Sequence, residues 1–110
     1  VSFSSRILRL EILRTIDRLR LANALTNEET ATIRESSYQL LEHFGFLPLS
    51  PTILDRAEQP FATPLGSLDS IHLATALLWR EQADFDFVFA THDTELATAA
   101  KAHGFTVIGI

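Results

Sequence analysis

Apolar side chains recur at helical spacing in the first part of the chain. We expect a first helix that begins after Ser4 or Ser5 and extends to about Leu21, because a serine hydroxyl can cap its free N–H groups. Thr26 and Glu29 then form a capping-box pattern, which predicts a second helix to about residue 43 that a glycine at position 45 ends. The apolar stripe that the first helix would bury consists of Leu8, Ile12, Ile16 and Leu19.

The central part of the chain predicts one strand and two helices. A proline within the apolar run at 46–49 places that strand at a sheet edge or a strand end, because proline cannot donate to a ladder. The second of the two helices is apolar on most sides, which indicates that it packs in the centre of the domain. The expected elements are a strand over 46–49, a short helix from Ser50-Pro51 to about Glu58, a loop over 59–66, and a helix over about 68–82 capped by Ser67.

The C-terminal part of the chain predicts a strand–helix–strand unit. The apolar run Phe85–Ala90 is continuous, which is the pattern of a strand covered on both faces. Asp93 is the expected cap of a helix over about 94–103, Gly104 suits the left-handed conformation after it, and a last strand covers 106–110. Two strands joined by a helix imply a right-handed crossover and a parallel sheet, so we expect one α/β domain.

The order of these elements is unusual for a parallel α/β sheet. It begins with two helices and contains three strands, although the strand that begins at Phe85 should have a neighbour on either side. We therefore expect a further strand before Val1. The chain also has no methionine, even at position 1, so we expect it to be processed or to be a piece of a longer chain.

Composition narrows the class of protein. A hydrophobic fraction of 46% is enough for one packed core. The net charge of −5 argues against a module that coats nucleic acid through phosphates, though not against an enzyme that contacts it at one small metal site. The chain lacks cysteine, an apolar run of roughly 20 residues and a signal-peptide pattern, so we expect a cytoplasmic protein without a membrane partner.

Three carboxylates are candidates for a functional site. Asp93 follows the expected buried strand, and open α/β sheets bind ligands at the carboxyl ends of strands; the alternative is a helix cap worth ~1 kcal/mol. Asp69 lies in the first turn of the central helix, where the helix dipole favours a carboxylate. Its neighbours in the sequence are apolar, and a charged group in such surroundings needs a partner. Glu11 lies in the first helix, where Arg14 and Arg18 offer it an ordinary ion pair.

A cluster of carboxylates suits magnesium or manganese, which prefer oxygen ligands. Metal ions held in this way neutralise the charge of a phosphodiester, activate water and stabilise the leaving oxygen. We interpret His72 as a packing residue of its helix and His92 as an exposed neighbour of the carboxylates. Zinc is disfavoured because the four histidines share no close ligand spacing: His43, His72, His92 and His103.

Three segments carry the candidate carboxylates. They are Arg9-Leu10-Glu11-Ile12-Leu13-Arg14, Ser67-Leu68-Asp69-Ser70-Ile71-His72-Leu73-Ala74-Thr75-Ala76, and Phe89-Ala90-Thr91-His92-Asp93. In their order and spacing the chain resembles the PIN-domain nucleases, specifically the VapC toxins of bacterial toxin–antitoxin pairs. The middle segment is the most specific, and the resemblance extends from about Ser4 to Ile110.

The resemblance implies a single PIN-like α/β domain over residues 1–110, with a parallel sheet flanked by helices in three layers, α/β/α. It implies a Mg²⁺- or Mn²⁺-dependent endoribonuclease toxin of a type II toxin–antitoxin system. Glu11, Asp69 and Asp93 would be its catalytic and metal-binding residues, and the Thr91 hydroxyl would orient the last aspartate. The implied partners are an RNA substrate, a VapB-like antitoxin and a second copy in a homodimer.

The chain departs from the family pattern in one respect. The family pattern begins with an Asp, followed closely by Thr or Ser, at the end of a first strand, and no such residue precedes Glu11. We expect the chain to be N-terminally truncated, with this Asp on the strand expected before Val1. The 110 residues by themselves would then bind metal weakly and cleave RNA poorly.

Two other functions compete with the nuclease. A catalytically incompetent PIN-like fragment or protein-binding module would fit a chain with one carboxylate absent. A receiver- or hydrolase-like domain with Asp93 as nucleophile fits less well, because no phosphate-binding glycine loop is present. Five of the nine basic residues also lie on the first helix, where they solvate it or form a patch for RNA or an acidic antitoxin segment: Arg6, Arg9, Arg14, Arg18 and Arg20.

Overall fold

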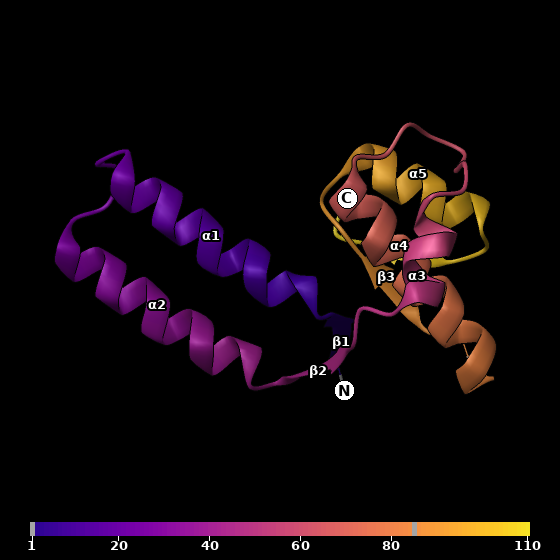
Figure 1. The fold of residues 1–110 in the computed structure, drawn as a ribbon, viewed down its shortest axis with the longest axis horizontal. Helices are drawn as coiled ribbons and strands as arrows, with labels where there is room; N and C mark the ends of the chain where they lie inside the picture. The colour runs from indigo at the N-terminus through magenta and orange to yellow at the C-terminus, as the bar shows by residue number, and fades with distance from the viewer. Residues whose placement is uncertain (1, 85) are drawn as a thin grey trace. The chain divides into compact units, whose positions relative to one another are not determined.

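The computed structural model describes residues 2–84 and 86–110. They fall into two compact units, Val1–Pro48 and Leu49–Ile110, which are described separately. Figure 1 draws the first unit in indigo to magenta and the second in magenta to yellow. Within the described residues, no helix combines the length and the apolar character that a membrane crossing requires.

The first unit is a two-stranded parallel sheet whose strands are joined by a pair of helices. Ser2 lies opposite Phe44 in the ladder, and Ser5 lies opposite Leu47. The two helices lie side by side and are connected by a short turn (Figure 1). The elements in chain order are β1 (Ser2–Ser5), α1 (Ile7–Leu21), α2 (Asn27–Leu41) and β2 (Phe44–Leu47).

The start of the first helix was predicted wrongly, because Ser4 and Ser5 belong to β1. Backbone pairing with β2 holds this segment extended, and periodicity within a short window does not report such a distant partner. Ser5 still serves the helix: it is 2% exposed, and its Oγ accepts a hydrogen bond from the Ile7 N–H at 3.4 Å. Arg6 occupies the N-cap position without a side-chain cap.

β2 begins two residues earlier than expected, so Gly45 lies inside the strand and does not end the helix. A Cβ built on Gly45 would lie 2.5 Å from Cδ1 of Phe3, its partner in the β1–β2 ladder. This close approach explains why a residue with no side chain occupies the position. The capping box of α2 is confirmed, with Thr26 Oγ1 accepting from Glu29 N–H at 3.0 Å and Glu29 Oε1 accepting from Thr26 N–H at 2.9 Å.

The apolar stripe expected on the first helix is only partly buried. Ile16 is 4% exposed, Leu8 and Ile12 are half-buried, and Leu19 is 42% exposed. The buried apolar side chains of this unit are few among the described residues: Ile7, Ile16 and Leu41.

The second unit consists of three helices and a second two-stranded parallel sheet, with α3 against α4 and α5 against β4. β3 pairs with β4, with Val88 opposite Thr106 and Ala90 opposite Ile108, as the strand–helix–strand pattern predicted. Its core consists of Leu73, Leu77, Leu96, Ala99, Ala100 and Phe105. The elements are α3 (Pro51–Ala57), α4 (Ser67–Ala83), β3 (Val88–Ala90), α5 (Thr94–Ala102) and β4 (Thr106–Ile108).

The strand of this unit was expected to be covered on both faces, and in the described residues it is covered on one. Phe87 and Phe89 pack against the core, whereas Val88 is 52% exposed. On β4, Ile108 is 57% exposed. A continuous apolar run does not distinguish these two cases, and the expected first residue of the strand, Phe85, lies outside the described residues.

Three of the four expected features at the helix ends of this unit are confirmed. Ser50 Oγ accepts from the Ile53 N–H at 3.2 Å with Pro51 in the first turn, and Gly104 has φ +89° after α5. Asp93 is the N-cap of α5. The cap assigned to Ser67 was wrong: the N-cap of α4 is Gly66, and Ser67 is the first helical residue.

Candidate functional site

The segment Thr91–Asp93 connects β3 to α5 and is held against the end of β4. Thr91 N–H donates to Ile108 O at 3.0 Å, and His92 Nδ1 lies 2.7 Å from Gly109 O. Gly109 has φ +99°, and a Cβ there would lie 2.6 Å from Thr91 O. Two backbone segments therefore touch directly, and they fix the position from which Asp93 begins the helix.

Asp93 has one carboxylate oxygen engaged by the helix. Its Oδ1 accepts from the Leu96 N–H at 2.8 Å, which is the helix-cap alternative considered for this residue. Its N–H donates to Thr91 Oγ1 at 3.1 Å, so the threonine hydroxyl acts on the backbone of the aspartate. The side chain is exposed, and Oδ2 forms no hydrogen bond with the described residues, so this oxygen is available to a cation.

Asp69 lies half-buried in the first turn of α4. α5 connects the parallel strands β3 and β4 and therefore runs antiparallel to them, which places its N-terminus at the end of the sheet where β3 finishes. A direct hydrogen bond links the loop before α4 to the start of α5, because Thr63 donates through Oγ1 to Glu95 O at 2.7 Å in the first turn of α5. Asp69 and Asp93 thus occupy the same end of the second unit.

Glu11 lies half-buried in α1, in the first unit. The arginines considered as its ion-pair partners contact other residues: Arg14 pairs with Asp17 at 3.1 Å, and Arg18 donates to Thr15 Oγ1 at 3.1 Å. Both arginines therefore have contacts within their own helix.

The donor chemistry fits a hard divalent cation. Within either unit, the described residues contain no group of three or more His, Cys, Asp or Glu side chains that could hold a metal ion. Mg²⁺ usually takes one or two carboxylates together with waters and substrate phosphate, and the carboxylates of Asp69 and Asp93 are donors of this kind. His92 is exposed and its Nδ1 faces a carbonyl, in agreement with its interpretation as a neighbour of the carboxylates.

Sequence reasoning missed the residues that hold the aspartate loop. Ile108 and Gly109 position Thr91 and His92 through backbone contacts, so no side-chain chemistry marks them. The available signal was a glycine next to a strand, which often indicates a close backbone approach.

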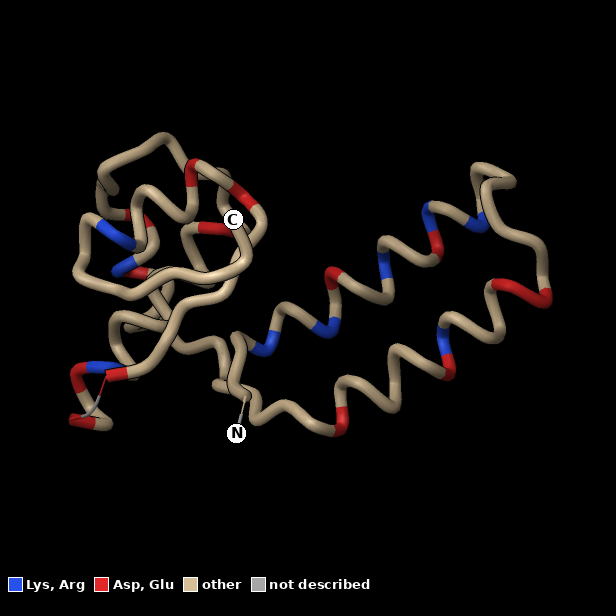
Figure 2. Tube along the Cα trace, turned by 180° about the vertical axis from the view of Figure 1, so that it is seen from behind, with Lys and Arg blue, Asp and Glu red and all other residues tan. Residues whose placement is uncertain are grey.

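The basic residues of α1 are partly neutralised within their own helix. Figure 2 shows blue and red positions interspersed along it. A hydrogen bond from Arg20, with further attraction from Arg14, holds the pKa of Asp17 below its ordinary value. Arg9 lies over the ring of Tyr38, 5.2 Å from its centroid. These contacts account for several of the arginines that the sequence offered as an RNA or antitoxin patch.

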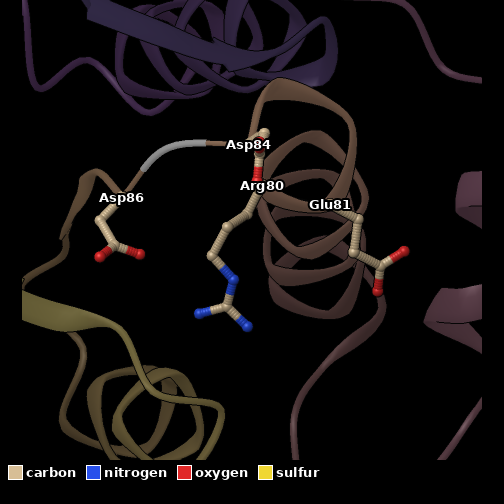
Figure 3. Close-up of a pocket in the computed structure, with 4 residues that line it drawn as sticks. All are labelled: Arg80, Glu81, Asp84 and Asp86. Atoms are coloured by element: carbon tan, nitrogen blue, oxygen red, sulfur yellow. The ribbon is translucent and has the colours of Figure 1, made fainter.

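A mixed-charge cavity lies at the opposite end of α4 from Asp69. Its volume is about 430 Å³, and it is lined by Arg80, Glu81, Asp84 and Asp86 (Figure 3). Arg80 lies over the ring of Phe105, 4.1 Å from its centroid, which holds the cation against the core. The placement of this cavity makes it separate from the end of the unit that carries Asp69 and Asp93.

Comparison with known proteins gives one family and no individual relative. Neither the curated proteins nor the solved structures contain a match to this chain. The model of the PIN domain matches residues 1–102. PIN domains are generally nucleases and typically use divalent metal ions. The mixed α/β elements with parallel strands agree with the expected PIN-like fold, and the chain belongs to the PIN domain family.

Proposed function

We propose that the protein is a Mg²⁺- or Mn²⁺-dependent endoribonuclease of the VapC type. The observation that carries the proposal is the joint placement of Asp69 and Asp93 at one end of the second unit of a PIN-family chain. Carboxylate oxygens are the ligands that Mg²⁺ and Mn²⁺ prefer. RNA supplies the anionic phosphodiester that such a site needs as substrate.

The residues divide into ligands and positioning groups. Asp69 and Asp93 would hold the divalent ion, which when bound supplies charge neutralisation of the phosphate and activation of water. Glu11, in the first unit, is a candidate ligand on the family pattern alone. Asp93 uses Oδ1 for the helix cap, which leaves Oδ2 for the ion. Thr91 positions Asp93 through its backbone N–H. Two sides of the aspartate are therefore fixed before any ligand binds.

The proposal is tested with variants that keep the helix cap and remove the charge. Asn is as good an N-cap as Asp, so Asp93→Asn should leave the unfolding free energy nearly unchanged. Removing one ligand of a catalytic metal site should lower RNA cleavage at least about 100-fold. Asp69→Asn should have an effect of the same order. Cleavage of a labelled RNA in Mn²⁺ or Mg²⁺ measures both, and growth arrest on expression provides a cellular readout.

A matched control is Asp86→Asn, which removes an aspartate from the opposite end of α4. It should leave cleavage within about twofold of the parent, since surface substitutions away from a site are usually near neutral. Retention of full cleavage by Asp93→Asn, or equal loss in all three variants, would contradict the site assignment. Cleavage that persists in excess chelator would contradict the metal requirement.

A toxin of the VapC type would act together with protein partners. We propose that the protein is a homodimer neutralised by a VapB-like antitoxin. Exposed leucines on the helices of the first unit support a protein contact there: Leu10 and Leu21 on α1 and Leu40 on α2 are each more than half exposed. A monomer by light scattering, or a failure of every co-expressed VapB-like antitoxin to relieve growth arrest, would contradict this part.

A protein-binding module without catalysis is the second candidate function. It is favoured by the absence, within either unit, of three described ligand side chains grouped around one point. It predicts partner binding that Asp69→Asn and Asp93→Asn leave unchanged, together with no RNA cleavage by the parent protein.

A further inference from the structure

The loop before α4 lines a cavity that is open to solvent. Its volume is about 490 Å³, which is in the range of small-molecule sites. It lies wholly within the second unit, between the end of α3 and the start of α4. Its lining includes Glu58, Gln59, Pro60, Phe61, Thr63 and Ser70, and this set is called the loop cavity below.

The loop cavity contains a hydroxyl that the protein does not use. Ser70 is 8% exposed as a residue, and its N–H bonds to Gly66 O, but its Oγ forms no hydrogen bond with the described residues. The Oγ atom is open to solvent, since it is not among the buried unpaired side-chain atoms of the described residues. Because Ser70 lines the cavity, this hydroxyl is accessible as a donor or acceptor to a group that enters the cavity.

A second unpaired donor lies close by. Nη1 of Arg56 is buried and has no hydrogen-bond partner among the described residues. The Arg56 guanidinium lies over the ring of Phe61, 4.7 Å from its centroid, and the rings of Phe61 and His103 form a T-shaped contact with centroids 5.8 Å apart. The ring that lines the cavity is therefore held in place on two sides before any ligand arrives.

The lining favours a flat, uncharged, polar-edged ligand over an anion. No lysine or arginine lines the loop cavity, and Glu58 would repel a phosphate. The prolines and Phe61 supply apolar and aromatic surface, while Ser70, Gln59 and Glu58 supply hydrogen-bonding groups. Aromatic surface with donors and acceptors for ring edges is how proteins hold unstacked bases of single-stranded RNA.

The position of the loop cavity links it to the aspartates. Ser70 follows Asp69 directly in α4. Thr63, in the wall of the cavity, donates to Glu95 O in the first turn of the helix that Asp93 caps. A base in the cavity would thus lie at the same end of the unit as both aspartates.

We propose that the loop cavity binds one unpaired nucleobase of the RNA substrate and sets the base preference of cleavage. This inference rests on the proposed ribonuclease function for its substrate. Phe61 stacks on the base, Ser70 hydrogen-bonds its edge, and the adjoining phosphodiester lies toward Asp69 and Asp93.

The first experiment measures binding and does not require cleavage. Amide shifts of the isotope-labelled protein are followed by NMR during titration with AMP, CMP, GMP, UMP and inorganic phosphate. We expect saturable shifts at Phe61 and Ser70 with the nucleotides, unequal among the four bases, and none with inorganic phosphate. Equal shifts with inorganic phosphate, or no saturable shift at these amides, would overturn the proposal.

Two variants separate the roles within the cavity. Ser70→Ala removes a hydroxyl with no partner in the protein, so the fold should be retained while affinity for the preferred base falls about tenfold. Phe61→Leu should weaken the binding of all four nucleotides to a similar extent, because an aromatic ring can stack on any base. The matched control is Thr75→Val, which removes another hydroxyl of α4 outside the loop cavity and should leave nucleotide binding unchanged. Unchanged binding by Ser70→Ala would overturn the proposal.

The second experiment distinguishes RNA from a free nucleotide and separates this inference from the proposed function. A four-nucleotide RNA that contains the preferred base should bind more tightly than the mononucleotide, and Ser70→Ala should flatten the base preference at the cleavage position. Equal affinity for both ligands would contradict an RNA subsite. Nucleotide binding at Ser70 without any RNA cleavage would contradict the proposed ribonuclease function but would still support a nucleobase site in the loop cavity.

Discussion

Among the described residues of the second unit, nine apolar side chains are buried, from Ile53 on α3 to Phe105 beside β4, and most belong to the two helices at whose starts Asp69 and Asp93 lie. The described residues of the first unit include three buried apolar side chains, and this unit depends more on strand pairing, a capping box and short-range ion pairs. Packed cores resist deformation, whereas surface ion pairs and caps each contribute about 1 kcal/mol or less. The comparison indicates that the two aspartates have a stiffer support than Glu11.

The largest expected effect comes from the core of the second unit. Leu73 is fully buried, and its replacement by Ala should lower the unfolding free energy by about 3 kcal/mol, because it removes apolar contacts and leaves a cavity. Leu10→Ala, at a site 58% exposed in α1, should change it by less than about 0.5 kcal/mol. Urea unfolding followed by circular dichroism measures both. Similar costs at the two sites would remove the contrast between the units.

The two close-packed glycines give a second contrast. Gly109→Ala should lower the unfolding free energy by about 2 kcal/mol, because φ is +99° and the new Cβ would meet the rigid backbone at Thr91. Gly45→Ala should lower it by about 1 kcal/mol, because its Cβ would meet the ring of Phe3, which is 43% exposed and can turn away. RNA cleavage should fall in the first variant and not in the second. Equal effects on cleavage would show that the Thr91–Asp93 segment does not need this support.

The caps offer a smaller effect with a local readout. Thr26→Ala removes half of the capping box of α2 and should lower the unfolding free energy by about 1 kcal/mol. Ser50→Ala should lower it by a similar amount, but the buried side chain of Ile53 should keep α3 in place. Hydrogen exchange should therefore speed up across α2 in the first variant and remain slow in α3 in the second. Uniform loss of protection in both variants would contradict the difference in anchoring.

The smallest expected effect depends on pH. Burial, with repulsion from Arg56 and Arg80, holds the pKa of His103 below its ordinary value of 6.5. The unfolded chain therefore takes up this proton first, and stability falls as the pH drops through the ordinary pKa until the folded imidazole also protonates. His103→Gln should flatten the dependence of the unfolding free energy between about pH 8 and pH 5. An unchanged dependence of the unfolding free energy on pH in this variant would show that His103 is not its cause.

Local signals in the sequence predicted much of the second unit. Ser50-Pro51, Asp93 and Gly104 mark helix ends through residues next to them, and these boundaries agree with the structure. The strand at Ser2–Ser5 was missed because its partner, β2, is distant in the chain. For the candidate site, the strand-end position of Asp93 was predictable, whereas the support from Gly109 and the unused Ser70 hydroxyl depend on contacts that appear only after folding.

The registers of the two ladders also have a consequence for the order of folding. Ser2 must find Phe44, whereas Val88 must find Thr106, so the loop that β1 and β2 close has more than twice as many residues. Closing the longer loop costs about 0.8 kcal/mol more in chain entropy. Contacts between residues closer in sequence form sooner on average, so the β3–β4 amides should gain protection in pulse-labelling experiments before those of β1–β2. The support for Asp93 would then be assembled while the segment around Glu11 is still searching for its strand partner.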